Sequence, residues 1–207
     1  GALPAPLSRL LWELRVHRLV DGVVTAGHAF GGDLEAVNVF SGLLAARHVL
    51  GADVTVVAMG PGVVGTGTPF GTTAVEVGQL VDAAGALGGR PVVAPRLSFA
   101  DPRARHRGLS HHTLTALLRV AHRRALVALP PLAGEEARVV AEQLADSGLA
   151  ERHEVRVVDP GDALAVLARA GIPLESMGRR EADDPAFFAA GAAAGCLAAS
   201  LALEAAA

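Results

Sequence analysis

The chain alternates between short runs rich in Val and longer runs with helical periodicity, and this alternation constrains its fold more than any other feature. The short runs predict strands at 22–25, 53–59, 91–97, 125–129 and 153–158. The longer runs predict helices at 33–48, 72–87, 110–124, 134–147, 162–170 and, rich in Ala, 185–206. This alternation predicts a single α/β domain over residues 1–207, with a mainly parallel, Rossmann-like sheet of about five strands and helices on both faces in three layers.

The composition indicates a protein that buries apolar surface against a partner. The hydrophobic fraction is 51% and the mean hydropathy is +0.40, and both are high for a soluble domain of 207 residues. We therefore expect a homo-oligomer, or packing against an N-terminal segment that precedes Gly1. The formal charge of −3 and the aromatic content of 3% argue against nucleic acid as a partner.

Residue usage also excludes several chemistries and indicates a compartment. All 18 basic residues are Arg and Tyr is absent, which excludes a Schiff-base lysine, a P-loop lysine and a tyrosine general acid. The single cysteine, Cys196, excludes intrachain disulfides and Cys-rich metal sites and fits a reducing cytoplasm. The start of the chain shows no signal segment and we expect no transmembrane helix, so the sequence predicts a cytoplasmic protein without a membrane partner.

Three elaborate loops follow the first three predicted strands: 26–33 (AGHAFGGD), 60–71 (GPGVVGTGTPFG) and 96–113 (RLSFADPRARHRGLSHHT). Each of them leads into a predicted helix, whereas the loops after the last two strands are short and plain. Because ligands of open α/β sheets bind beyond the carboxyl ends of the strands, these loops predict one localised site.

The second loop begins with the G-x-G-x-x-G spacing of a dinucleotide-binding turn, from Gly60 to Gly65. Further glycines and Pro69 delay the helix, and the next strand ends in Arg96 rather than in an acid that would bind a ribose. An arginine at that position suits a 2′-phosphate, so NADP is kept as an alternative. The preferred interpretation is a backbone cradle for a phosphate or carboxylate, and a turn without a ligand is the second alternative.

The third loop combines four arginines with three histidines. Ser110 suits the N-cap of the following helix, which places His111 and His112 in its first turn. The helix dipole disfavours a cationic imidazole there, and a neutral imidazole suits a general base or a metal ligand. Clustered arginines repel one another unless an anion meets them, and Asp101 can neutralise one of them. The alternative is a solvated, charged loop.

These loops and the turn at 175–180 supply the candidate residues. In the first loop, Asp33 suits either a helix cap or the orienting partner of His28, and Glu35 and Asn38 would share one helix face. The candidate catalytic residues are His28, Asp33, His111 and His112. The candidate ligand-binding residues are Gly62, Gly65, Thr66, Gly67, Thr68, Arg96, Asp101, Arg103, Arg105, His106, Arg107, Glu35, Asn38 and Arg179. The candidate ligands of a divalent metal are His28, His106, His111 and His112, although the H-E-x-x-H spacing of zinc-binding helices is absent.

Four long motifs resemble an uncharacterised bacterial family, a domain of unknown function. They are TAGHAFGGDLEAVNVFSGL at 25–43, AMGPGVVGTGT at 58–68, RLSFADPRARHRGLSHHTLTAL at 96–117 and SMGR at 176–179. The resemblance covers essentially the whole chain and implies no activity. It does imply that family members are longer, so the chain is expected to be a C-terminal portion that lacks an N-terminal segment.

Together the residues favour an enzyme of hydrolase or group-transferase type that acts on a small anionic, phosphate- or nucleotide-like ligand, with a divalent metal as a candidate cofactor. One alternative is a non-catalytic ligand-binding or sensor subunit that uses the same loops. Another is an NADP-dependent oxidoreductase.

Overall fold

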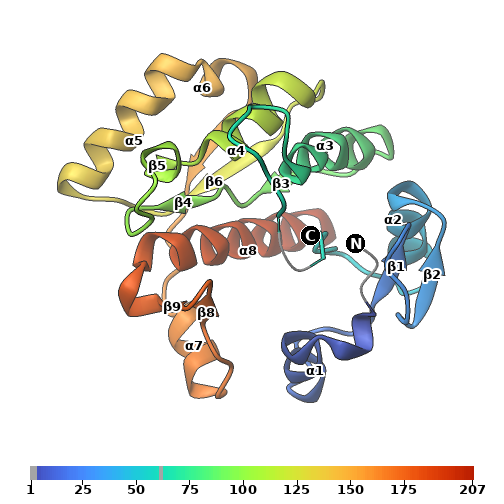
Figure 1. Cartoon of the computed structure of the whole chain (residues 1–207). Helices are drawn as coiled ribbons and strands as arrows, with labels where there is room; N and C mark the ends of the chain where they lie inside the picture. Colours follow the sequence, from blue (N-terminus) through green and yellow to red (C-terminus); the bar gives the residue numbers. More distant parts are fainter. Residues whose placement is uncertain (1–3, 61–62) are drawn as a thin grey trace.

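The computed structural model describes residues 4–60 and 63–207 (Figure 1). Its centre is a parallel sheet of three strands, in the order β3 (Val92–Val93), β6 (Leu126–Leu129) and β7 (Glu154–Val157). Mixed helices and strands with parallel pairing confirm the α/β class. The central sheet, however, has three strands among the described residues rather than the five that the sequence predicts.

The other elements surround this sheet. The α-helices are α1 (Arg9–Val16), α2 (Val39–His48), α3 (Glu76–Ala86), α4 (His111–Thr115), α5 (Gly134–Ser147), α6 (Leu149–Arg152), α7 (Ala163–Arg169) and α8 (Pro185–Ala206). The short strands outside the sheet are β1 (Val24–Ala26), β2 (Leu34–Ala36), β4 (Leu97–Ser98), β5 (Gly108–Leu109), β8 (Glu175–Ser176) and β9 (Arg179–Arg180). The remaining helical turns are η1 (Ala5–Leu7), η2 (Thr73–Val75), η3 (Ala104–His106), η4 (Ala116–Val120, a π-helical turn) and η5 (Glu181–Asp183). The helices predicted at 134–147 and 185–206 are confirmed at both ends.

The central strand β6 is buried over its whole length because helices cover both faces of the sheet (Figure 1). Val127 and Leu129 belong to one core, which α3 and α5 also line. Leu126 and Ala128 belong to a second core, which α8 lines. Successive side chains of a strand point to opposite faces, so the continuous apolar run LVAL suits a strand that is covered on both sides.

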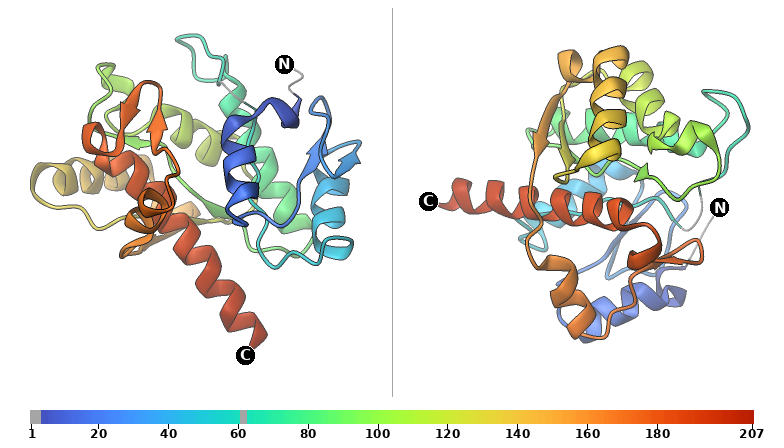
Figure 2. Two further views of the ribbon diagram at one scale, coloured as in Figure 1. Left: turned by 90° about the horizontal axis from the view of Figure 1, so that it is seen from below. Right: turned by 90° about the vertical axis from the view of Figure 1, so that its left-hand side faces the viewer.

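Helix α8 packs on the sheet through small residues. Ala190 and Ala193 are fully buried, and its last turns extend beyond the rest of the molecule (Figure 2), where Leu203 is 72% exposed. By length and composition α8 could cross a membrane, and it is the one helix of the described residues that could. One face of α8 packs on the sheet, and 33% of its most apolar window is buried. The sequence-based expectation of no transmembrane helix stays a prediction.

The N-terminal elements form a unit of their own beside the sheet (Figure 1). Strand β1 pairs in parallel with β2, not with the central sheet, with Val24 opposite Leu34. The helix predicted at 33–48 therefore begins only at Val39, because its first residues are used in β2. Asn38 fixes that start: its side chain accepts a hydrogen bond from the Ser41 N–H at 3.1 Å.

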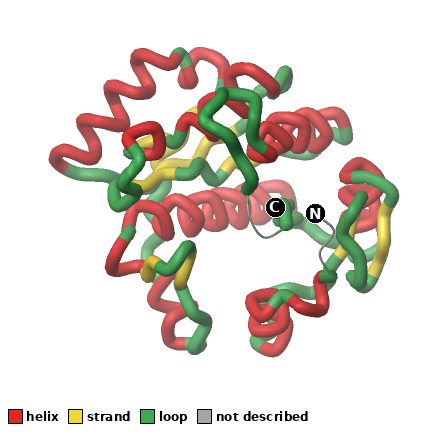
Figure 3. The backbone as a smooth tube through the Cα atoms, viewed as in Figure 1, coloured by secondary structure: helices red, strands yellow, loops and turns green. Residues whose placement is uncertain are grey.

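The strand predicted at 53–59 is wrong. Apart from residues 61–62, which lie outside the description, Figure 3 draws the connection from α2 to η2 as loop. Val56 is 87% exposed, and no described strand pairs with this segment. An apolar, β-branched run forms a strand only where a neighbouring backbone edge accepts its hydrogen bonds, and no strand in the described part of the chain offers such an edge here.

The helix predicted at 110–124 ends at Val120, after the π-helical turn η4. Side chains from neighbouring elements make hydrogen bonds with the backbone N–H and carbonyl groups at this end of the helix. Asp82 of α3 accepts hydrogen bonds from the N–H groups of His122 and Arg123, both at 2.8 Å. Arg152 of α6 donates to the Leu118 carbonyl at 3.2 Å and to the carbonyl of Ala121. These bonds replace those that another helical turn would make.

Candidate functional site

The site is built on the segment that follows β3, which folds back on itself as the antiparallel pair β4–β5. The N–H of Arg96 donates to the Thr113 hydroxyl at 3.0 Å, and the N–H of Ser110 donates to the Arg96 carbonyl at 2.9 Å. Gly108 has a φ of +71°, which favours glycine. Gln143 of α5 accepts from the Leu109 N–H at 2.7 Å and thereby fixes the turn. The loop is thus held in place beyond the carboxyl end of β3.

Three of the four candidate metal ligands, His106, His111 and His112, meet in this loop. Their ring centroids lie 4.2 to 5.0 Å apart, and one ligand nitrogen from each lies within 4.8 Å of the others. His106 is 1% exposed, and its Nδ1 lies 2.7 Å from the Ser110 hydroxyl. Ser110 caps α4, as the sequence predicts, by accepting from the His112 N–H at 3.2 Å. The fourth candidate, His28, is exposed in the N-terminal unit and does not belong to this cluster.

Burial is the main cause of the low pKa values of these histidines. It lowers the pKa of His106 to about 4, and the charges of Arg103 and Arg96 add to the effect. It also lowers the pKa of His112 to about 4, with His111 as the next contributor, and the pKa of His111 shifts in the same direction. All three imidazoles are therefore neutral at pH 7. The sequence predicts neutral imidazoles from the helix dipole, and in the structure burial gives a further reason for them.

A buried carboxylate holds two of the arginines next to the histidines. Asp101 accepts from Arg96 Nη2 at 2.6 Å and from Arg103 Nε and Nη2 at 2.9 and 2.8 Å. These guanidinium groups, with Arg103 contributing most, hold the pKa of the Asp101 carboxyl well below its usual range. Arg107 instead lies over the Phe99 ring, 5.5 Å from its centroid.

Arg105 is exposed, like Arg103 and Arg107, but in the described part of the chain it has no side-chain partner. It makes no hydrogen bond within the described residues, and its charge helps to lower the pKa of His111 and His112, after burial in both cases. With Asp101 matched against Arg96 and Arg103, the loop retains an excess of positive charge beside neutral imidazoles.

A hydrogen-bond network extends from this carboxylate to Arg179. The Asp101 N–H donates to the Ser98 hydroxyl at 3.2 Å, which donates in turn to Asp184 at 2.6 Å. Arg179 Nε lies 3.4 Å from the same oxygen of Asp184. The β8–β9 hairpin thereby joins the site, with the Met177 sulfur 3.8 Å from Arg96. Sequence reasoning missed Ser98 and Asp184, because residues 86 positions apart leave no spacing pattern.

Two polar atoms of the cluster have no partner. Arg96 Nε and His111 Nε2 are buried without a hydrogen bond, and among the described residues that are not exposed no other side-chain nitrogen or oxygen shares that condition. Buried polar groups are nearly always hydrogen-bonded, so two exceptions in one loop distinguish this place from the rest of the molecule.

The other candidates of the first loop have local structural roles. Asp33 caps no helix: it accepts from Arg15 at 2.7 Å and from the Val23 N–H at 2.9 Å, and so ties α1 to the start of β1. Glu35 lies in β2 and accepts from the Gly31 N–H at 2.9 Å. It cannot share a helix face with Asn38, which is the N-cap of α2. The structure therefore does not bring this loop to the histidine cluster.

The glycine-rich loop closes on itself. The hydroxyls of Thr66 and Thr68 lie 2.8 Å apart, and Thr68 also accepts from the Gly71 N–H at 3.2 Å. Gly65 and Gly67 are exposed, and Gly62 lies outside the described residues. No described strand leads into this loop, so it lacks the strand–turn–helix context of a dinucleotide-binding fingerprint. Its base nevertheless lies next to α4, through η2.

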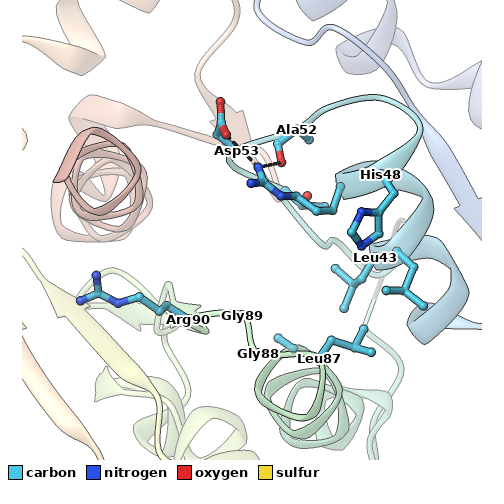
Figure 4. Close-up of a pocket in the computed structure, with 12 residues that line it drawn as sticks. Leu43, His48, Ala52, Asp53, Leu87, Gly88, Gly89 and Arg90 are labelled. Carbon is cyan, nitrogen blue, oxygen red and sulfur yellow. Dashed lines mark hydrogen bonds and ion pairs between the residues drawn. The ribbon is translucent and has the colours of Figure 1, made fainter. Parts of the chain in front are cut away.

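A pocket elsewhere in the molecule is a weaker candidate for a catalytic site than the histidine loop. A cavity of about 330 Å³ lies between the ends of α2 and α3 (Figure 4). Arg47, His48 and Arg90 line it, and Arg47 pairs with Asp53 at 2.8 Å. None of its lining residues is buried, so no group there is held in a desolvated position, in contrast to the histidine loop.

Comparison with known proteins gives one match. A family model described as "Protein of unknown function (DUF3866)" matches residues 1–195. This match confirms the resemblance but gives no support to the expectation that the chain is the C-terminal portion of a family member. No curated protein matches, and no solved structure matches.

Proposed function

The chain belongs to this family of unknown function, and we propose that it is an enzyme of hydrolase or group-transferase type that binds a small anionic, phosphate- or nucleotide-like ligand at the histidine loop. One observation carries the proposal: a buried guanidinium nitrogen of Arg96 and a buried imidazole nitrogen of His111 lack partners in the same cluster. A ligand that accepts from Arg96 would satisfy the first of them.

The charges of the loop favour an anion. Arg96 and Arg103 share a single carboxylate, and Arg105 makes no hydrogen bond within the described residues. Guanidinium groups recognise phosphate and carboxylate oxygens through paired, charge-assisted hydrogen bonds. An anion between Arg96 and Arg105 would also relieve their mutual repulsion.

The histidines favour catalysis over simple binding. Burial keeps the three imidazoles neutral, and neutral imidazoles beside a bound anion can activate a water molecule, either as bases or through a metal that they hold. A site that only binds an anion would gain more from protonated histidines. Hydrolysis or group transfer is preferred to redox chemistry, because the glycine-rich loop lacks the dinucleotide-binding context.

Calorimetric titration of chelator-treated, tag-free protein with inorganic phosphate and pyrophosphate tests the binding step. We expect Arg105→Ala to weaken binding about tenfold or more, because one charge-assisted hydrogen bond contributes roughly 1.5–3 kcal/mol. Arg124→Ala is the matched control: Arg124 is also exposed, but it precedes the amino end of β6, whereas the histidine loop lies beyond the carboxyl end of the parallel strand β3. Equal affinity of the two variants would overturn the assignment of the site.

Turnover separates the proposal from its two alternatives. We expect release of phosphate from a panel of phosphate esters and nucleotides, with His112→Ala reducing the rate at least a hundredfold. Phosphate binding without turnover of any ester would instead favour a ligand-binding or sensor subunit. Thermal stabilisation by NADP that exceeds stabilisation by phosphate would favour the oxidoreductase.

A further inference from the structure

We propose that His106, His111 and His112 bind one divalent transition-metal ion of the Zn²⁺ type, with an open coordination position that faces the arginines. The inference deepens the proposed function and rests on it for the identity of the co-ligand. It starts from the nitrogens of three imidazoles, one per residue, which lie within 4.8 Å of one another.

The distances suit metal binding after small side-chain rotations. Zn–N bonds of about 2.0–2.1 Å in a tetrahedral site place neighbouring ligand nitrogens roughly 3.4 Å apart. The three nitrogens, which lie within 4.8 Å of one another, must therefore move closer together to bind one ion. The side chains of His111 and His112 are only partly buried and can rotate to allow this. His106 is fixed by burial and would act as the anchor.

Two of the three ligands are already prepared for this role. Nδ1 of His106 lies 2.7 Å from the Ser110 hydroxyl, and when Nδ1 donates to that oxygen its Nε2 presents a lone pair. Such outer partners commonly orient metal-binding histidines. The Nε2 of His111 is buried without a partner, so coordination would satisfy it without breaking a protein hydrogen bond.

The chemistry of the donors and of their surroundings defines the ion and its fourth ligand. Imidazole nitrogens select Zn²⁺, Co²⁺ or Ni²⁺ over Mg²⁺ and Ca²⁺, which prefer oxygen. No carboxylate oxygen belongs to the cluster, and the nearby Arg96, Arg103 and Arg105 would repel a bare cation. An anion in the fourth position offsets this repulsion, and it is the same small anion that the arginines would bind. Three histidines and an exchangeable fourth ligand form a catalytic rather than a structural site.

The direct test is titration of tag-free, chelator-treated full chain with Co²⁺, whose visible absorption is strong in a tetrahedral site and weak in water. We expect one Co²⁺ per chain, displacement by Zn²⁺, and at least tenfold weaker binding in His111→Ala and His112→Ala. His122→Ala is the matched control, because the His122 side chain is 86% exposed and outside the cluster. No tetrahedral absorption, or equal binding by all variants, would overturn the inference.

A second measurement needs no variant. Histidine side-chain nitrogen NMR of the wild-type chain should show Zn²⁺-dependent shifts for three of its eight histidines. Shifts at fewer than three, or at histidines outside the cluster, would contradict the site. The outcome is separable from that of the proposed function: phosphate binding by metal-free protein without Co²⁺ binding refutes only the metal, and Co²⁺ binding without phosphate binding refutes only the anion site.

Discussion

At the scale of single residues, the site depends on one buried carboxylate. The Asp101 side chain is completely buried and is bonded to both Arg96 and Arg103. The sequence suggests that Asp101 neutralises one arginine of its loop, and the structure shows that it holds two. Without it, both guanidinium groups would face the imidazoles and each other with no compensating charge, so the arrangement of the arginine–histidine loop follows from this residue.

We expect Asp101→Asn to lower the free energy of unfolding by about 2–3 kcal/mol at pH 7, because it leaves charged donors with a neutral acceptor. The pKa of Asp101 is depressed in the folded chain, with Arg103 as the main cause. Its stabilisation is therefore complete above the unfolded-state pKa of about 3.9, and is lost as the pH falls towards the folded-state value.

Urea denaturation at several pH values checks both parts of this prediction. The difference between wild type and Asp101→Asn should shrink as the pH is lowered from about 6 to about 3. Asp21→Asn, at an exposed position without a hydrogen bond in the described residues, should show neither effect. If the difference in unfolding free energy between wild type and Asp101→Asn stays constant with pH, the arginines do not lower the pKa of Asp101 in the folded chain.

At the scale of elements, α4 and η4 form one continuous helical segment that carries His111 and His112 of the site. Side chains of α3 and α6 bind the backbone where this segment ends. The sequence has helical periodicity as far as Arg124, but the helix stops at Val120. Asp82 of α3 accepts hydrogen bonds from the N–H groups of His122 and Arg123. Arg152 of α6 donates to the carbonyls of Leu118 and Ala121 at the end of the helix. A π-helical turn of this kind is rare and is often found near functional sites, which agrees with the two histidines one turn earlier.

We expect Asp82→Ala to destabilise the chain by about 1–3 kcal/mol, because two backbone N–H groups and the His122 ring lose their acceptor. Thermal unfolding would measure it, with Asp146→Ala as the control at an exposed helical position. Hydrogen exchange should also accelerate at His122 and Arg123 in the variant. Unchanged exchange there would show that Asp82 does not terminate the helix.

At the scale of the whole molecule, α8 covers one face of the sheet and the N-terminal unit lies beside it (Figure 1). Large apolar side chains such as Trp12, Val37 and Phe40 are exposed in that unit, at 61%, 87% and 45%. They agree with the high hydropathy of the chain. The homo-oligomer expected from composition remains a prediction, which sedimentation of the purified chain would check.

We expect Ala193→Leu to lower the free energy of unfolding by about 1–3 kcal/mol, because Ala193 is fully buried in the core between α8 and β6 and a larger side chain would force the two apart. Ala199→Leu, on the exposed face of the same helix, should have little effect. Denaturant unfolding of the two variants compares them. Equal stability would mean that α8 does not pack on the sheet in solution.

The sequence by itself determined the strand β6, the helices α5 and α8, the Ser110 cap and the loop where arginines and histidines gather. These features follow from local periodicity, capping chemistry and composition, which neighbouring residues specify. It could not determine which loops meet. His28 and His111 look equally suited to chemistry in the sequence, and only the packing of distant elements separates them.

Tertiary structure decided the strand count, the end of η4 and the composition of the site. Residues 53–59 have a strand's sequence, but no described strand lies beside them, and β1 pairs with β2 instead of extending the central sheet. Asp184 joins the site from 86 positions away, through Ser98. Hydrogen bonds between distant segments depend on which surfaces pack together, and packing is a property of the whole chain that no local pattern encodes.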